Sequence, residues 1–218
     1  MSIYGEAHRA LQDQFDSRRL ADRLEQAMVT DRLNDTAHIA FIESRDFFFL
    51  STVNQHGEPT VSHKGGPVGL VRVLDEKTLV FPSYDGNGMF MSMGNIVCTG
   101  KIGMLFIDFE TPNRVRVQAT ASVSSNDSLL SDFPGAQLLV RARVDTAFVN
   151  CARYIHRHAR LETSRYVPNE QGHAPLASWK RIGFVQDVLP ASDVGRVATE
   201  GGLITGEDYN DKLTRGES

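Results

Sequence analysis

The sequence has few cysteines, no strong excess of one charge and no long hydrophobic run. Its only two cysteines among 218 residues, Cys98 and Cys151, are too few for a disulfide framework. A net charge of -4 argues against a dedicated nucleic-acid binder. No apolar run approaches the roughly 20 residues that cross a bilayer, and the first nine residues lack the apolar core of a signal peptide. We therefore expect a soluble, reduced, cytoplasmic protein that binds neither nucleic acid nor membrane.

Common catalytic and metal-binding motifs are missing as well. The seven histidines include no HExxH pattern, and the one close pair, His156 and His158, would diverge on a helix. No nucleophile elbow, P-loop or complete G-x-G-x-x-G fingerprint occurs. We therefore predict no metal site. Cys98, between apolar residues, is expected to be buried and inert, and Cys151 beside Arg153 is either reactive or, more simply, structural.

The composition and the N-terminal third are typical of a globular protein. Hydrophobic residues make up 41% and charged residues 23% of the chain. Apolar residues recur at helical spacing over 6–29, and again over 35–44, where Asn34 or Asp35 is the expected N-cap. We interpret both helices as packing elements. A further short helix is expected over 150–158.

From residue 47 the hydrophobic pattern changes to the period of strands. Strands are expected at 47–53, 59–63, 69–74, 78–83, 101–109, 113–123 and 136–149. Six or seven antiparallel strands at close spacing protect their edges by closing into a barrel or stacking as a sandwich. We predict a mainly β fold, a barrel with added helices. It forms a single domain over 1–200 with its core at about 46–150, followed by a polar tail over 201–218 that we expect to be partly disordered.

Two segments have the chemistry of an anion site. In the first, Ser62–Pro67, a strand ends in a loop with two adjacent glycines, which allow a ligand to approach the backbone, and Lys64 offers a point charge for a phosphate. The simpler interpretation is a turn with a solvated lysine. The second segment passes through an Asp-Gly-Asn-Gly turn into a helix expected over 88–96, whose N-terminus suits an anion. Asn87 would cap this helix, bind the anion, or both, and Ser83 and Ser92 could add hydrogen bonds.

Two groups of large side chains could either bind a planar ligand or pack in the core. Methionines 89, 91, 93 and 104 with Phe90 and Phe106 resemble a box that stacks on a planar cofactor, although such spacing is more typical of core packing. Trp179, the only tryptophan, precedes Lys180. It is either a core or interface anchor or a cover for a planar ligand, with Lys180 reaching a phosphate.

Four motifs in order carry a resemblance to a known family. They are Phe48–Pro59, Val61–Pro67, Phe81–Asn87 and Ile102–Asp108. Together they resemble the pyridoxamine 5'-phosphate oxidase-like family of FMN-binding split β-barrels, and most closely its flavin-nucleotide-binding branch. The similarity runs over about 39–123, with further matches at 149–155 and 178–180.

The resemblance implies a homodimer that holds FMN between its subunits. Residues 61–65 would follow the flavin ring and ribityl chain, residues 82 and 83 would meet the same part of the cofactor, and residues 87–92 would lie by the phosphate. Arg72 would also serve the phosphate. The implied cofactor-binding residues are Ser62, His63, Lys64, Gly65, Arg72, Pro82, Ser83, Asn87, Met89, Ser92, Arg153, Trp179 and Lys180.

The sequence departs from the true oxidases at two places. Gly88 and Met89 stand where those enzymes have a basic pair, and the arginine-rich C-terminal segment that recognises pyridoxal phosphate has no counterpart. Oxidation of vitamin B6 is therefore not expected. The resemblance implies an FMN-dependent oxidoreductase of unknown substrate and unknown catalytic residues, with His63 the best acid–base candidate by position. The alternatives are a non-catalytic module that stores, carries or senses flavin, and a split barrel that binds a deazaflavin or haem.

Overall fold

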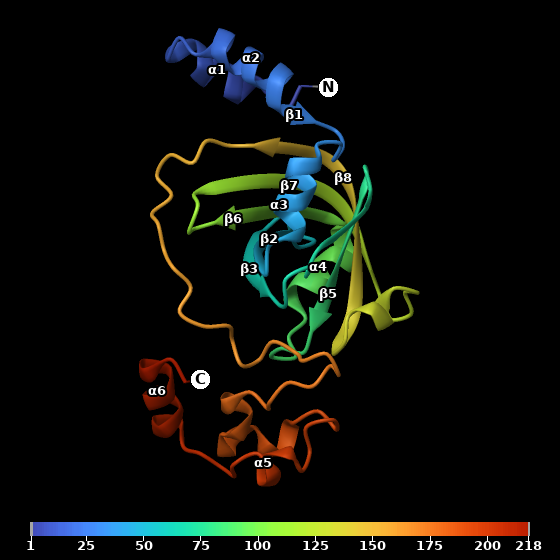
Figure 1. Cartoon of the computed structure of the whole chain (residues 1–218), viewed down its shortest axis with the longest axis vertical. Coiled ribbons are helices and arrows are strands. Elements are labelled where there is room, and N and C mark those ends of the chain that lie inside the picture. The colour runs from blue at the N-terminus through green and yellow to red at the C-terminus, as the bar shows by residue number, and fades with distance from the viewer. Residues whose placement is uncertain (1, 218) are drawn as a thin grey trace. The chain divides into compact units, whose positions relative to one another are not determined.

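The computed structural model describes residues 2–217 and divides into two compact units (Figure 1). The first unit extends to Leu161 and the second begins at Glu162. The sequence-based division, with a domain ending at residue 200, stays a prediction. Within residues 2–217 no helix is long and apolar enough to cross a membrane.

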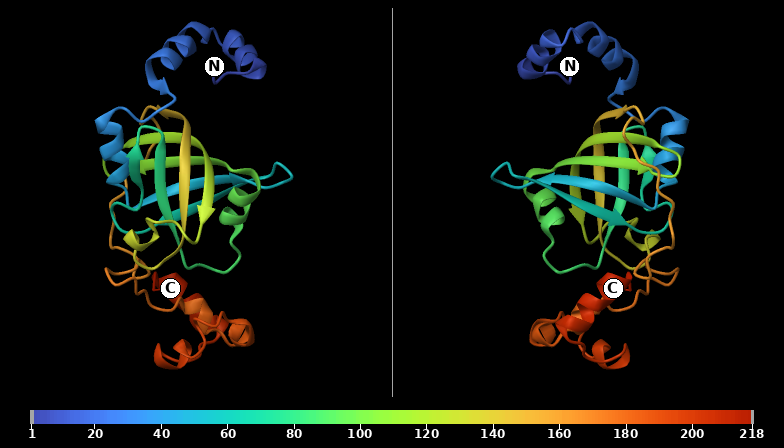
Figure 2. Two further views of the ribbon diagram at one scale, coloured as in Figure 1. Left: turned by 90° about the vertical axis from the view of Figure 1, so that its right-hand side faces the viewer. Right: turned by 90° about the vertical axis from the view of Figure 1, so that its left-hand side faces the viewer.

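The first unit contains one antiparallel sheet that curls into a barrel (Figure 2). Its strands follow the order β3-β2-β6-β7-β8-β5-β4, with β1 added beside β8. The outermost strands, β3 and β4, do not pair with each other, so the sheet stays open as a split barrel. The predicted fold class is confirmed. The strands are β1 (Val29–Thr30), β2 (Phe47–Val53), β3 (Pro59–Gly65), β4 (Arg72–Asp75), β5 (Thr78–Tyr84), β6 (Lys101–Asp108), β7 (Asn113–Ser124) and β8 (Ala136–Val149).

The alternation of side chains along the strands forms the barrel core. In β2 every second residue is buried, and β7 repeats the pattern with Val115 and Val117 inside. Three phenylalanines fill the centre: the ring of Phe48 lies 5.1 Å from that of Phe81 and 5.4 Å from that of Phe106. All three are fully buried, so they supply much of the apolar area removed from water.

The N-terminal helices differ from the single helix predicted over 6–29. Helix α1 (Glu6–Gln14) ends and α2 (Arg18–Met28) begins around Asp16, whose φ of 50° is left-handed and breaks the helical path. Helix α3 (Thr36–Glu43) agrees with its prediction. Its N-cap is Asp35, whose carboxylate accepts a hydrogen bond from the backbone N–H of Ala37 at 2.8 Å.

Helix α4 (Met91–Thr99) begins three residues later than predicted. Gly88 and Phe90 have φ values of 75° and 49°, and this left-handed backbone keeps the helix from starting at residue 88. The helix ends at Gly100, which is also left-handed. Cys98 on this helix is exposed, contrary to our expectation that it is buried.

The helix predicted over 150–158 is absent, and this segment is irregular. The N–H of His158 donates to the carbonyl of Phe109, and the guanidinium of Arg157 donates to the carbonyl of Glu110. Both contacts lie at the turn between β6 and β7. The backbone N–H of His158 is therefore satisfied by this distant turn and not, as in a helix, by a carbonyl within the segment.

The second unit consists of short helices around a small core. It contains 3₁₀ helices Ser178–Arg181 and Gly183–Val188, α5 (Arg196–Thr199) and α6 (Gly206–Arg215). Lys180 is only 1% exposed, and its ammonium lies 2.7 Å from the carboxylate of Asp193 inside this unit. Helix α6 begins with a capping box between Thr205 and Asp208, within the segment that we expected to be partly disordered.

Candidate functional site

Strand β3 lies at the edge of the sheet and presents two different faces. Ser62 and Lys64 are half-buried and lie opposite Leu50 and Phe48 of β2, so they point toward the barrel interior. Their neighbour His63 is exposed on the other face, where its ring stacks on Phe47 at 5.4 Å. Side chains predicted to follow one ligand are thus divided between two faces of the sheet.

Lys64 has the most unusual electrostatic position in this region. It lies beside the fully buried Phe48, and burial lowers the pKa of its ammonium group. Among residues 2–217 its ammonium makes no hydrogen bond and no ion pair. A half-buried cation without a counter-charge is unfavourable, so the site is suited to an anionic ligand.

The N-terminus of α4 lies next to this strand. The hydroxyl groups of Ser62 and Ser92 are 3.0 Å apart, which joins β3 to the first turn of the helix. The N-cap residue, Phe90, makes no side-chain hydrogen bond to the first turn of α4. The backbone N–H groups of that turn are therefore available to an anion. The buried side-chain amide of Asn95 donates to the hydroxyl of Thr52 at 3.0 Å and holds the helix on the sheet.

The loop from β5 to α4 corrects the role assigned to Asn87. Its side-chain oxygen accepts a hydrogen bond from the N–H of Met89 at 3.0 Å, so Asn87 stabilises the turn before α4 and does not cap the helix. The group of methionines and phenylalanines is also divided. The buried members are Met93, Met104 and Phe106, whereas the exposed members are Met89, Phe90 and Met91.

The end of β5 borders the same region. Pro82 is buried, and Ser83 and Tyr84 are half-buried. A Cβ added at Gly66 would lie 2.7 Å from a methyl group of Leu70 and 3.1 Å from the ring of Tyr84, so the chain just after Lys64 passes Tyr84 closely. Burial raises the pKa of the Tyr84 phenol.

Arg72 is near Tyr84 but already has partners. Its positive charge opposes the burial effect on the Tyr84 pKa. Its guanidinium donates to the backbone carbonyl of Asp132 at 2.8 Å, lies 3.3 Å from the carboxylate of that residue, and lies over the ring of Phe133. A phosphate would have to compete with Asp132 for this arginine.

The last three predicted residues lie elsewhere in the chain. Arg153 is exposed in the irregular segment after β8. Trp179 and Lys180 belong to the second unit, where the charge of Lys180 is balanced by Asp193. The described contacts therefore join Ser62 to Ser92, place Lys64 on the same face of β3 as Ser62, and bring the chain just after Lys64 close to Tyr84. Lys180 instead pairs with Asp193 in the second unit.

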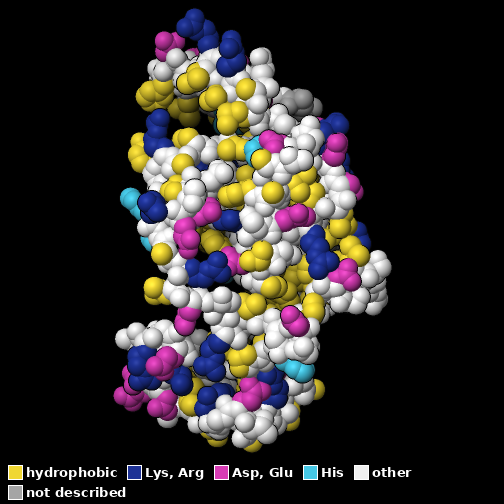
Figure 3. Space-filling model, in the orientation of Figure 1, with side chains coloured by type: hydrophobic (Ala, Val, Ile, Leu, Met, Phe, Trp, Pro, Cys, Tyr) yellow, Lys and Arg dark blue, Asp and Glu magenta, His cyan; other side chains and the backbone are white. Residues whose placement is uncertain are grey.

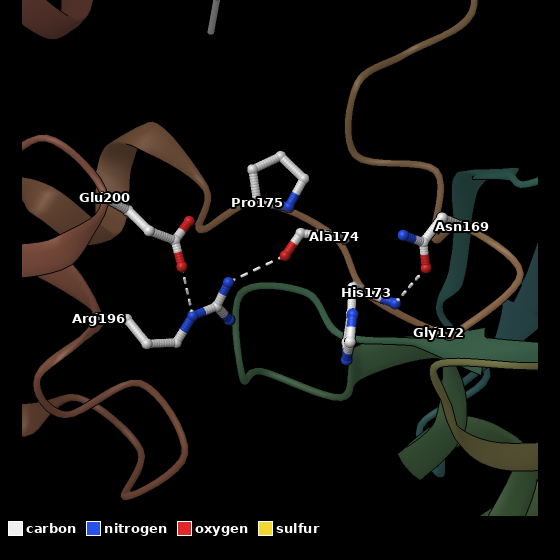
Figure 4. A pocket seen from close by; sticks show the side chains of 7 residues that line it. All are labelled: Asn169, Gly172, His173, Ala174, Pro175, Arg196 and Glu200. Carbon is white, nitrogen blue, oxygen red and sulfur yellow. Dashed lines mark hydrogen bonds and ion pairs between the residues drawn. The ribbon is translucent and has the colours of Figure 1, made fainter.

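The sequence analysis did not predict two hollows that described residues line. One, of about 450 Å³, lies over the outer side of the sheet, where Ser51, Gly103 and Gln118 lie side by side in register. A glycine inside a strand was the available signal, because it leaves room over the sheet. The other hollow, of about 550 Å³, lies in the second unit beside Arg196 and Glu200 (Figure 4). Within residues 2–217 no three histidine, cysteine or acidic side chains gather as metal ligands.

The chain is similar to a known protein family and to several solved structures. A family model described as pyridoxamine 5'-phosphate oxidase matches residues 35–160. A putative pyridoxamine 5'-phosphate oxidase from Lactobacillus delbrueckii is 24% identical, with 55% of this chain and 99% of that chain covered and a TM-score of 0.42. An FMN-binding protein from Syntrophomonas wolfei is 14% identical, with coverages of 62% and 95% and a TM-score of 0.35. The haem storage protein HutZ from Vibrio cholerae is 17% identical, with coverages of 53% and 93% and a TM-score of 0.39. No curated protein matches the chain.

The family model covers more than half of the chain and includes the elements that build the site. Its matched residues run from the N-cap of α3 through the end of β8, and they contain β3, the loop after β5 and α4. The open antiparallel sheet agrees with this match. The chain therefore belongs to the pyridoxamine 5'-phosphate oxidase family.

Proposed function

We propose that this protein binds FMN and is an FMN-dependent oxidoreductase. The observation that carries the proposal is the half-buried ammonium of Lys64, which has no counter-charge among residues 2–217. A phosphate group placed beside it would accept charge-assisted hydrogen bonds from Lys64 and from the free N–H groups at the start of α4. The hydroxyls of Ser62, two residues before Lys64 on the same face of β3, and of Ser92, in the first turn of α4, lie 3.0 Å apart and join these two elements.

The residues present fit the phosphate end of such a ligand. The lysine, the serine hydroxyls and the helix N-terminus are all hydrogen-bond donors, and none of them is an acidic group that would repel a phosphate. Bound FMN would supply the capacity to accept and release electrons or a hydride. The part of this chain is to hold the phosphate and to orient the cofactor.

His63 has a separate role in this proposal. Neighbouring residues of a strand point to opposite faces, so His63 and Lys64 cannot bind the same phosphate. His63 lies in an exposed aromatic group with Phe47 and Phe49. We propose that it meets the cofactor ring or the substrate from that face, in the homodimer that the family resemblance implies.

Purification tests the cofactor directly. We expect a yellow protein with a flavin absorbance band and about one FMN per chain, identified by mass spectrometry of the extracted ligand. Extraction of haem or a deazaflavin, or a colourless protein that cannot be reconstituted with FMN, would reject the proposal. Oxidation of NADH or NADPH with oxygen, quinone or cytochrome as acceptor then tests turnover.

A second candidate function is a flavin-binding module without turnover. It is favoured by the polar side chains that link β2 and β3 to α4, which are hydroxyls and an amide. None of these groups exchanges a proton near neutral pH. Tight FMN binding together with no reduction by any donor of a broad panel would favour this module over the oxidoreductase.

A further inference from the structure

The two N-terminal helices expose apolar side chains that sequence spacing places in rows. Leu11 and Phe15 are four residues apart, and Leu20, Leu24 and Met28 continue the same spacing along α2. All five are exposed, Phe15 at 72% and Leu20 at 61%. We call these five residues the apolar stripe. The space-filling view shows hydrophobic side chains gathered on these helices (Figure 3).

The helices contact each other through their polar sides. Arg9 of α1 lies 2.6 Å from Asp22 and 3.9 Å from Glu25 of α2, and Arg18 pairs with Asp13 across the turn. Neither helix has a buried residue. The hairpin is therefore joined by charges, and its apolar stripe faces away from the contact between its helices.

Such a hairpin is not expected to be stable by itself. Its helices have nine and 11 residues, and helices shorter than about 12–15 residues are marginal in water. Exposed ion pairs add only about 0–1 kcal/mol each. The stripe presents roughly 500 Å² of apolar surface, judged from about 150–250 Å² for one large side chain, which is at the upper range of patches on monomers and is often functional.

The charges beside the stripe indicate its partner. Four arginines and five carboxylates lie between Glu6 and Met28, so the hairpin lacks the basic excess of a helix that binds an anionic membrane. Among residues 2–217, the hairpin residues Glu6, Asp16, Arg19 and Arg23 make no ion pair. The hairpin thus carries unpaired charges of both signs, which suits a contact with the same surface of a second copy, where opposite charges can pair.

We propose that the apolar stripe is an interface with the same hairpin of a second copy of this chain. The two hairpins pack stripe to stripe as a four-helix arrangement. With roughly 500 Å² of apolar surface from each copy plus the polar rim, the contact approaches the ~800 Å² per partner of a stable interface. This interface is separate from any contact between barrels and does not depend on FMN.

Dimer dissociation on dilution, followed by light scattering, tests the interface. The double variant Leu20→Asp/Leu24→Asp is expected to raise the dissociation constant about tenfold or more, because it places carboxylates in an apolar contact. The matched control, Gln14→Asp/Gln26→Asp, adds the same charge at exposed polar positions and should change the constant less than about twofold, since rim charges contribute little. An equal effect of the two variants would overturn the proposal.

Cross-linking distinguishes a lost interface from unfolding of the helices by the introduced aspartates. In a chain whose two native cysteines are replaced by serine, Leu20→Cys and Leu24→Cys are oxidised separately and compared with Gln26→Cys. We expect disulfide-linked dimers from at least one leucine position and much slower linkage from Gln26→Cys. No difference among the three, or loss of vesicle binding in the double aspartate variant with an unchanged dissociation constant, would reject a second copy as the partner.

Discussion

Replacing Lys64 with methionine removes a charge from the proposed site and keeps a side chain of similar length. If the ammonium binds the FMN phosphate, the variant loses one charge-assisted hydrogen bond, which contributes about 1.5–3 kcal/mol. This loss corresponds to FMN binding that is roughly 10- to 150-fold weaker. Quenching of flavin fluorescence during titration of the apoprotein measures the affinity. Lys101→Met, a lysine exposed at the start of β6, is the control and should retain the affinity.

The same substitution has an opposite effect on the apoprotein. Burial lowers the pKa of Lys64 below its ordinary value of 10.5, so the folded chain holds this proton less tightly than the unfolded chain. The resulting penalty is complete at neutral pH, and it is relieved as the pH rises through the lowered pKa toward 10.5. Lys64→Met removes this penalty, so the unfolding temperature of the apoprotein at neutral pH should not fall. A lower unfolding temperature with unchanged FMN affinity would refute the assignment.

Three further changes test the fold and its electrostatics. Asp193→Asn removes the charged partner that lies 2.7 Å from the buried ammonium of Lys180 and should destabilise residues 162–218 by about 1.5–3 kcal/mol, seen as faster hydrogen exchange there and not in the barrel. The Asp31 carboxyl should titrate by NMR with a pKa of about 2, chiefly because of its hydrogen bond from Lys77. Lys77→Met should therefore raise the pKa of Asp31 toward 3.8. An unchanged pKa would contradict the pairing. The stability that depends on this carboxylate is present above pH 3.8 and is lost as the pH falls through about 2. Phe48→Ala should lower the free energy of unfolding of the barrel by about 3–5 kcal/mol in urea titrations, and a loss below about 1 kcal/mol would show that the core repacks.

The strands were predictable because their signal is local. The ranges expected at 47–53 and 136–149 match β2 and β8. The first was predicted from a short apolar run rich in strand-forming residues, and the second from alternating side chains along a strand. The helices near residues 15 and 90 were less predictable. Asp16 and Phe90 adopt left-handed backbone conformations, which hydrophobic periodicity does not reveal.

The candidate site was predictable only in part. The sequence singled out Lys64 and the start of the following helix, because a strand end with two glycines and a Gly-rich turn are visible in the residues themselves. It did not reveal that Asn87 serves its own turn or that Arg72 and Lys180 already have acidic partners. These partners lie 60 and 13 residues away along the chain and become neighbours only on folding.

The order of residues by itself indicated which segments form strands and which face of a strand is apolar. The inward position of Lys64 on β3 was decided by the structure. Only the tertiary structure decided which charges are neutralised. Periodicity is a property of adjacent residues, whereas the partner of a charge is set by segments that become neighbours only on folding. Lys64 was left without a carboxylate when the chain closed around it, and Arg72 and Lys180 were not. That difference, which no local pattern contains, singles out Lys64 as the candidate anion-binding residue.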